Sequence, residues 1–159
     1  MYDKDTFRST GFAHAAQILR LPPMNIETRI DRQNGLRTHV LRDEIKLSDI
    51  QAFLGKLYQA DDFDPALPIL WDVREAVFPE VSPIEVKELA YFVRANWSEK
   101  HRRKAAVLVT GDLHFGLSRM LEQFVGLFAQ GRLRTFRDPR AAIEWIEGKT
   151  SSAPFPVIE

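Results

Sequence analysis

The first clear pattern along the chain is an alternation of apolar or threonine side chains with charged or polar ones. Residues 26–30 alternate Ile or Thr with charged residues, Asn34-Gly35 follows, and the alternation resumes over residues 36–40. Asn-Gly is the dipeptide that best tolerates the positive φ angles of a type I′ turn. The pattern therefore predicts an antiparallel hairpin with one buried face.

Segments with helical spacing then alternate with short apolar runs. The apolar residues of the helical segments fall on one stripe of a helix. These segments lie at residues 47–58, 82–97, 113–129 and 138–146. The apolar runs, whose length is typical of buried strands, lie at residues 67–71, 105–110 and 133–136. The predicted order of elements is ββαβαβαβα.

This order predicts an α/β fold. Strands that alternate with helices pair in parallel through right-handed crossovers, and the opening hairpin adds an antiparallel edge. We expect a mixed β-sheet of about five strands with four helices packed on it, in a domain that spans residues 24–147.

Both ends of the chain are expected to lie outside this domain. Residues 1–23 form an N-terminal extension that ends at Pro22-Pro23, and its apolar residues between Phe12 and Leu19 could form a short helix docked on the domain. Residues 148–159 contain two prolines and no helical period, which predicts an extended C-terminal tail.

Composition excludes several classes of function. The chain has 159 residues with 22 basic and 22 acidic side chains, so no net charge draws it to nucleic acid or to an anionic membrane. The basic run Arg102-Arg103-Lys104 is expected on a solvated rim. Cysteine is absent, which excludes a thiol nucleophile, and no apolar run is long enough to span a membrane. No secretory signal is recognisable, so a cytoplasmic protein is expected.

Metal and cofactor sites are not expected either. The four histidines are His14, His39, His101 and His114, and none of them is spaced as in a His-x-x-x-His metal motif. Alternation places His39 on the exposed face of its strand. No glycine-rich phosphate-binding motif is present, so the sequence predicts no cofactor.

Three stretches of the chain carry a family resemblance. They are residues 68–72 running on to the helix at Ser82, residues 106–112, and residues 136–146 with the pattern Phe-x-Asp-x-x-x-Ala-x-x-Trp. Together with the element order, they resemble the SpoIIAA-like, or STAS-like, family over residues 24–147. The resemblance implies the same α/β fold. In the anti-sigma-factor antagonists of this fold, a partner kinase phosphorylates a serine that opens the helix after the third strand, and Ser82 occupies about that position.

Two interpretations of Ser82 are open. The resemblance implies a phospho-acceptor, and a helix N-terminus would stabilise the added negative charge. Ser82-Pro83 followed by Glu85 is also typical of a capping box, in which the serine only begins the helix. Asp72 and Asp112 follow predicted parallel strands, where ligands of open α/β sheets bind, so they are candidate strand-end loop residues.

The helix that begins at Ser82 is apolar on two sides. Opposite its buried stripe lie Ile84, Tyr91 and Ala95, and Phe115 of the next helix also points away from the core. An exposed apolar face marks a site for a partner or ligand. Alternatively, neighbouring helices or the N-terminal segment cover it.

These features predict a domain without catalysis that acts by binding. The first hypothesis is a regulatory protein-interaction module that forms a homodimer or binds an unidentified protein, as the resemblance to anti-sigma-factor antagonists implies. The second is a binder of a small hydrophobic ligand or lipid, similar to Sec14-type domains, with the ligand in an apolar cleft. Neither hypothesis involves nucleic acid or a membrane span.

Overall fold

The computed structural model of the chain describes residues 16–20, 25–97 and 103–149. Within these ranges, six strands form one mixed sheet in sequence order. They are β1 (Ala16–Arg20), β2 (Ile26–Asp31), β3 (Leu36–Glu44), β4 (Ile69–Val77), β5 (Ala105–Leu108) and β6 (Leu133–Phe136). The helices are α1 (Leu47–Gln59), α2 (Pro83–Ala95), α3 (Asp112–Gly126) and α4 (Pro139–Ile146).

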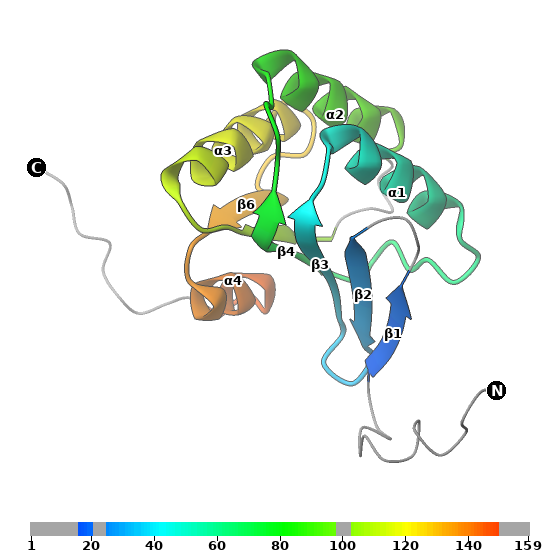
Figure 1. The fold of residues 1–159 in the computed structure, drawn as a ribbon. Helices are drawn as coiled ribbons and strands as arrows, with labels where there is room; N and C mark the ends of the chain where they lie inside the picture. The colour runs from blue at the N-terminus through cyan, green and yellow to red at the C-terminus, as the bar shows by residue number, and fades with distance from the viewer. Residues whose placement is uncertain (1–15, 21–24, 98–102, 150–159) are drawn as a thin grey trace, which may run out of the picture.

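Strand pairing follows the predicted α/β arrangement. β1, β2 and β3 pair antiparallel, and β3, β4, β5 and β6 pair parallel. Each parallel step crosses over through one helix. Because right-handed crossovers between successive strands all return on the same side, α1, α2 and α3 lie together on one face of the sheet. α4 follows the last strand and lies on the opposite face (Figure 1). The mixed α/β sheet with four helices that the sequence predicts is confirmed.

The N-terminal extension differs from the prediction. Ala16–Arg20 form strand β1, not part of a helix, and they add a sixth strand beside β2. The outer edge of β2 would otherwise present unpaired backbone N–H and C=O groups, and pairing with β1 satisfies them. The sheet therefore begins before the predicted domain boundary at residue 24. Residues 1–15 and 21–24 of the extension, and residues 150–159 of the tail, lie outside the described residues.

The hairpin between β2 and β3 is present, but its turn is longer than predicted. Asp31 pairs with Leu36, so four residues form the loop instead of two. Only Gly35 adopts a positive φ, 63°. The Asp31 carboxylate accepts hydrogen bonds from the backbone N–H groups of Gln33 and Asn34, both at 3.0 Å. These bonds stabilise a wider turn than the type I′ geometry that Asn-Gly alone suggests.

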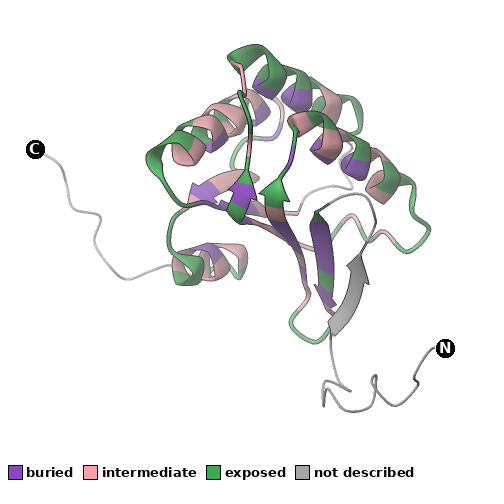
Figure 2. Cartoon of the chain, viewed as in Figure 1, coloured by how far each residue is buried: buried purple, intermediate pink, exposed green. Residues whose placement is uncertain are grey.

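The core consists of two layers of apolar side chains, one on each face of the sheet. The larger layer lies between the sheet and α1–α3, and the smaller one lies between β4, β5 and α4 (Figure 2). Successive side chains of β4 point to opposite faces of the sheet, so this strand contributes to both layers. Trp71 and Val73 face α1–α3, whereas Leu70 faces α4.

Candidate functional site

A cavity of about 170 Å³ lies between the sheet and helices α1–α3. Its walls are almost entirely apolar. They include Leu54 of α1, Ile69 and Trp71 of β4, Leu89 of α2, Val107 of β5 and Leu121 of α3. An apolar cavity of about 150 Å³ stays dry and binds a molecule such as benzene or xenon. This cavity can therefore hold a small apolar molecule.

The two ends of the cavity differ in chemistry. At the carboxyl ends of the strands, the lining includes Phe78 and His114, whose rings meet edge to face with centroids 5.3 Å apart. At the opposite end, the lining includes Tyr58, Arg103 and Arg132. Arg103 and Arg132 precede β5 and β6, and Tyr58 lies near the end of α1. The cavity is therefore basic at the end where the strands begin.

Two arginines at the basic end share one aromatic ring. The guanidinium carbons of Arg37 and Arg103 lie 5.0 Å and 5.1 Å from the ring centroid of Phe63. Arg103 also donates to the Pro65 carbonyl at 3.3 Å and hydrogen-bonds the Tyr58 hydroxyl. Its side chain is thus fixed on the cavity wall, half-buried, and not on the solvated rim that the sequence predicts.

Arg37 is the more deeply buried of the two, with 3% of its surface exposed. Its Nε and Nη1 atoms have no hydrogen-bond partner among the described residues. Burial lowers the pKa of Arg37, and the more distant charges of Asp62 and Asp64 act in the opposite direction. Burial is also the main reason that the pKa of Arg103 is lowered. In the described ranges, no carboxylate lies within 4.0 Å of either guanidinium.

His39 lies beside Arg37 on the same face of β3. It is fully buried, with its ring 4.5 Å from that of Trp71 and 5.0 Å from that of Phe53, between centroids. The predicted exposed position of His39 is therefore wrong. Burial lowers its pKa to about 3, and the charges of Arg37 and Arg103 contribute to this. The imidazole is neutral at pH 7.

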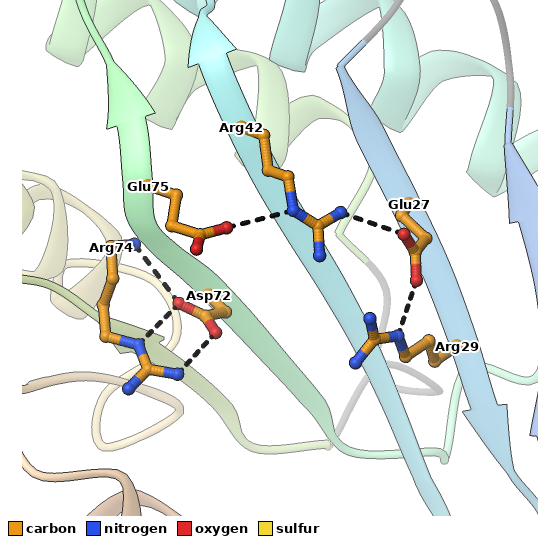
Figure 3. Close-up of polar contacts among 6 residues, drawn as sticks. All are labelled: Glu27, Arg29, Arg42, Asp72, Arg74 and Glu75. Carbon is orange, nitrogen blue, oxygen red and sulfur yellow. Dashed lines mark hydrogen bonds and ion pairs between the residues drawn. The ribbon is translucent and has the colours of Figure 1, made fainter.

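The opposite face of the sheet carries a row of ion pairs across β2, β3 and β4 (Figure 3). The Glu27 carboxylate accepts from Arg29 Nε at 2.6 Å and from Arg42 Nη1 at 2.9 Å. Arg42 Nε also donates to Glu75 at 3.0 Å. Hydrogen bonds from Arg29 are the largest influence on the pKa of Glu27 and lower it, against the opposing effect of burial. These carboxylates are engaged in structural pairs.

Asp72 does not lie at a strand end. β4 continues to Val77, because its second half pairs with β3 through Arg42, Asp43 and Glu44. Asp72 is therefore inside the strand, where Arg74 donates two bonds to its carboxylate, each of 2.9 Å. Burial raises the pKa of Asp72, but the bonds from Arg74 outweigh it, and the net shift is downward.

Asp112 does follow a strand, as predicted. It is the first residue of α3, after β5, and its exposed carboxylate accepts from Arg137 Nη2 at 2.9 Å.

Three of the four residues predicted to form a partner or ligand surface are exposed. Ile84 and Tyr91 are 69% and 54% exposed, and Ala95 is exposed on the same side of α2. Phe115 is a correction, because it is half-buried against the main core and Arg137 covers its ring at 4.4 Å. Of the residues predicted for this surface, the exposed ones therefore all lie on α2.

Ser82 caps α2. Its hydroxyl accepts from the Glu85 N–H at 3.3 Å, and the Glu85 carboxylate accepts from the Ser82 N–H at 2.8 Å. The capping box predicted from the sequence is confirmed. The role of Ser82 as a phospho-acceptor stays a prediction.

Two further features concern metals and membranes. Over residues 16–20, 25–97 and 103–149, no three histidine or carboxylate side chains gather into a metal-binding group. None of the helices described is both long and apolar enough to span a bilayer.

Several site residues were not predicted from the sequence. Arg37, Tyr58 and Phe63 become neighbours of Arg103 only through folding. One local signal was available, since Phe63 is a large apolar side chain among Asp61, Asp62 and Asp64 in a loop. An aromatic residue in such a polar loop indicates that the loop folds back onto the domain.

Comparisons with known proteins concern the fold. No model of a protein family matches the chain, and a search of curated proteins finds no match. Among solved structures, the chain is similar to the crystal structure of an uncharacterized protein from the DUF3478 family with a SpoIIAA-like fold, from Shewanella loihica PV-4. The two sequences are 17% identical, the match covers 83% of this chain and 92% of that chain, and the TM-score is 0.45.

Proposed function

We propose that this chain is a binding domain without catalysis, and that it holds a small apolar ligand in the cavity between its sheet and helices α1–α3. The observation that carries the proposal is the cavity itself, with about 170 Å³ of space and an apolar wall. A closely packed interior contains few voids larger than a water molecule. An empty cavity of this size destabilises the folded protein, because the side chains that line it lack van der Waals contacts on one side. A ligand that fills the cavity restores these contacts.

The polar groups of the domain support binding over catalysis. The Ser82 hydroxyl caps a helix, Asp72 is paired with Arg74, and Asp112 is paired with Arg137. None of the described residues that line the cavity is a carboxylate. Acid–base catalysis would require a general acid and a general base within hydrogen-bond reach of the bound substrate.

Two valine-to-phenylalanine variants test the proposal. Val107 lines the cavity, so Val107→Phe fills part of it with a residue that also suits a strand. Val77 is exposed at the end of β4, so Val77→Phe adds the same ring outside the cavity. Toluene is a suitable probe, with binding followed by protein NMR. We expect wild type and Val77→Phe to bind it alike and Val107→Phe to lose at least about tenfold in affinity.

Two outcomes contradict the proposal. One is a wild-type protein in which added toluene produces no saturable change in the NMR chemical shifts of the residues that line the cavity. The other is a Val107→Phe variant that binds toluene as well as wild type does.

A second function is favoured by the exposed stripe on α2. Ile84, Tyr91 and Ala95 present apolar surface along one side of the helix. Exposed apolar patches are typical of protein interfaces, and a homodimer is the simplest form. Light scattering over a range of protein concentrations tests it. We expect a dimer that Tyr91→Ser weakens and Arg94→Ser does not, whereas a monomer at all concentrations counts against self-association.

A further inference from the structure

The cavity described above has charge at one end only. Two arginines line it, Arg103 and Arg132, and both lie where β5 and β6 begin. The rest of the lining is apolar apart from Tyr58, His114 and Ser118. A ligand that fills the cavity is therefore met by apolar groups along its length and by cations at one end.

The charge of Arg103 is not neutralised by the described part of the protein. Its contacts are the Phe63 ring at 5.1 Å, the Pro65 carbonyl at 3.3 Å and the Tyr58 hydroxyl. Arginine stays protonated in proteins, and a partly buried cation is stabilised when an anion reaches it. Arg37 adds a second positive charge across Phe63. Asp62 and Asp64 act on Arg37 from a greater distance, so they offset part of that charge.

We propose that the ligand of this cavity is a small monocarboxylate, whose carboxylate binds Arg103 and whose short apolar group fills the space between the sheet and α1–α3. This inference rests on the proposed function, because it assumes that the cavity is a ligand site. A guanidinium group binds a carboxylate through two parallel N–H···O bonds. A doubly charged phosphate is disfavoured because more charge would have to leave water to enter a mostly apolar cavity.

The volume limits the size of the apolar group. A cavity of about 150 Å³ accepts benzene, so about 170 Å³ suits a group of roughly six carbons. Hexanoate and aromatic acids of similar size fall in this range. A long-chain fatty acid or a phospholipid exceeds it.

A pair of matched probes tests the inference. Hexanoate and 1-hexanol have the same chain and differ in the charge of the end group, and their affinities can be measured by calorimetry at neutral pH. We expect hexanoate to bind at least about tenfold more tightly than hexanol, because hydrogen bonds to a charged group are the stronger kind. We expect Arg103→Met to remove this difference by weakening hexanoate alone, and Arg94→Met, on the exposed side of α2, to leave both affinities unchanged.

The outcomes separate the two proposals. If hexanol and hexanoate bind equally to wild type, the carboxylate inference is wrong and the apolar site stands. If neither probe binds, and toluene does not bind either, the ligand site itself is wrong. The wild-type comparison decides the question even if Arg103→Met fails to fold, and Arg103→Lys, which keeps the charge, is expected to retain a preference for hexanoate.

Discussion

His39 and Thr28 are joined across β3 and β2 by a hydrogen bond of 2.9 Å between Nδ1 and Oγ1, in the buried layer that faces the helices. The other ring nitrogen of His39, Nε2, is buried and has no hydrogen-bond partner among the described residues. A protonated ring would have to bury a charge and a second N–H donor with no acceptor. The structure therefore stabilises the neutral imidazole.

This contact predicts a pH dependence of stability. The pKa of His39 is about 3 in the folded state, whereas an ordinary exposed histidine has a pKa of 6.5. Between these values the unfolded chain binds a proton that the folded chain does not, so stability falls as pH decreases below 6.5. From pH 7 to pH 5 the free energy of unfolding should drop by about 2 kcal/mol through this group. Urea unfolding at the two pH values measures it.

The control for this prediction is His39→Leu, which cannot titrate. Its absolute stability is secondary, because the test is the change between pH 7 and pH 5. A variant that loses as much stability as wild type over this interval would show that His39 is not the group responsible.

Glu27 and Glu75 provide a matched comparison of ion pairs. Both accept from Arg42, but the Glu27 side chain is 6% exposed and the Glu75 side chain 67%. We expect Glu27→Gln to lower the free energy of unfolding by about 1–2 kcal/mol, because it weakens charge-assisted bonds to two arginines in a buried position. Glu75→Gln should lower it by about 0.5 kcal/mol or less. Equal losses in chemical denaturation would contradict this assignment.

Ser82 permits a test of the capping box without any kinase. Ser82→Ala removes the acceptor for the Glu85 N–H and should lower stability by about 1 kcal/mol. Ser82→Asp keeps an acceptor and places negative charge at the positive end of α2, so it should differ from wild type by less than about 0.5 kcal/mol. Thermal unfolding of the two variants measures this. If alanine has no effect, the capping bond contributes nothing to stability.

The strand β3 shows how far the sequence pattern could be used. Alternation correctly located the strand and its hairpin partner, because the period of two is a local property of the backbone. It predicted only one buried face and placed His39 on the exposed face, which is wrong. Arg37 and His39 face α1–α3 and are buried, whereas Leu36 packs with the core on the side of α4. When both faces of a strand carry buried residues, alternation separates the faces without showing which one meets which layer.

The candidate site depends on contacts between residues distant in sequence, and no local sequence pattern indicates such contacts. The cavity lies between strands and helices that are distant in sequence, and its volume depends on how their side chains fit. The basic end likewise brings Arg37 of β3 together with Phe63 of a loop and Arg103 before β5. Sequence composition shows a basic run at residues 102–104, but whether a member of it faces solvent or a cavity is decided by the packing of the loop before β4.

Arg37 is expected to lower the free energy of unfolding of the ligand-free protein. A buried guanidinium whose Nε and Nη1 atoms find no partner in the described structure is destabilising, and methionine retains much of its apolar stem. We expect Arg37→Met to raise the free energy of unfolding by about 1 kcal/mol, after the loss of its contact with Phe63 is included. Arg42→Met is the matched control, and it should be destabilising by about 1–2 kcal/mol because Arg42 binds two carboxylates. A loss of stability for Arg37→Met as large as that for Arg42→Met would show that Arg37 is a structural residue. A gain, together with weaker binding of hexanoate, would indicate that the fold retains Arg37 for the ligand at the expense of its own stability.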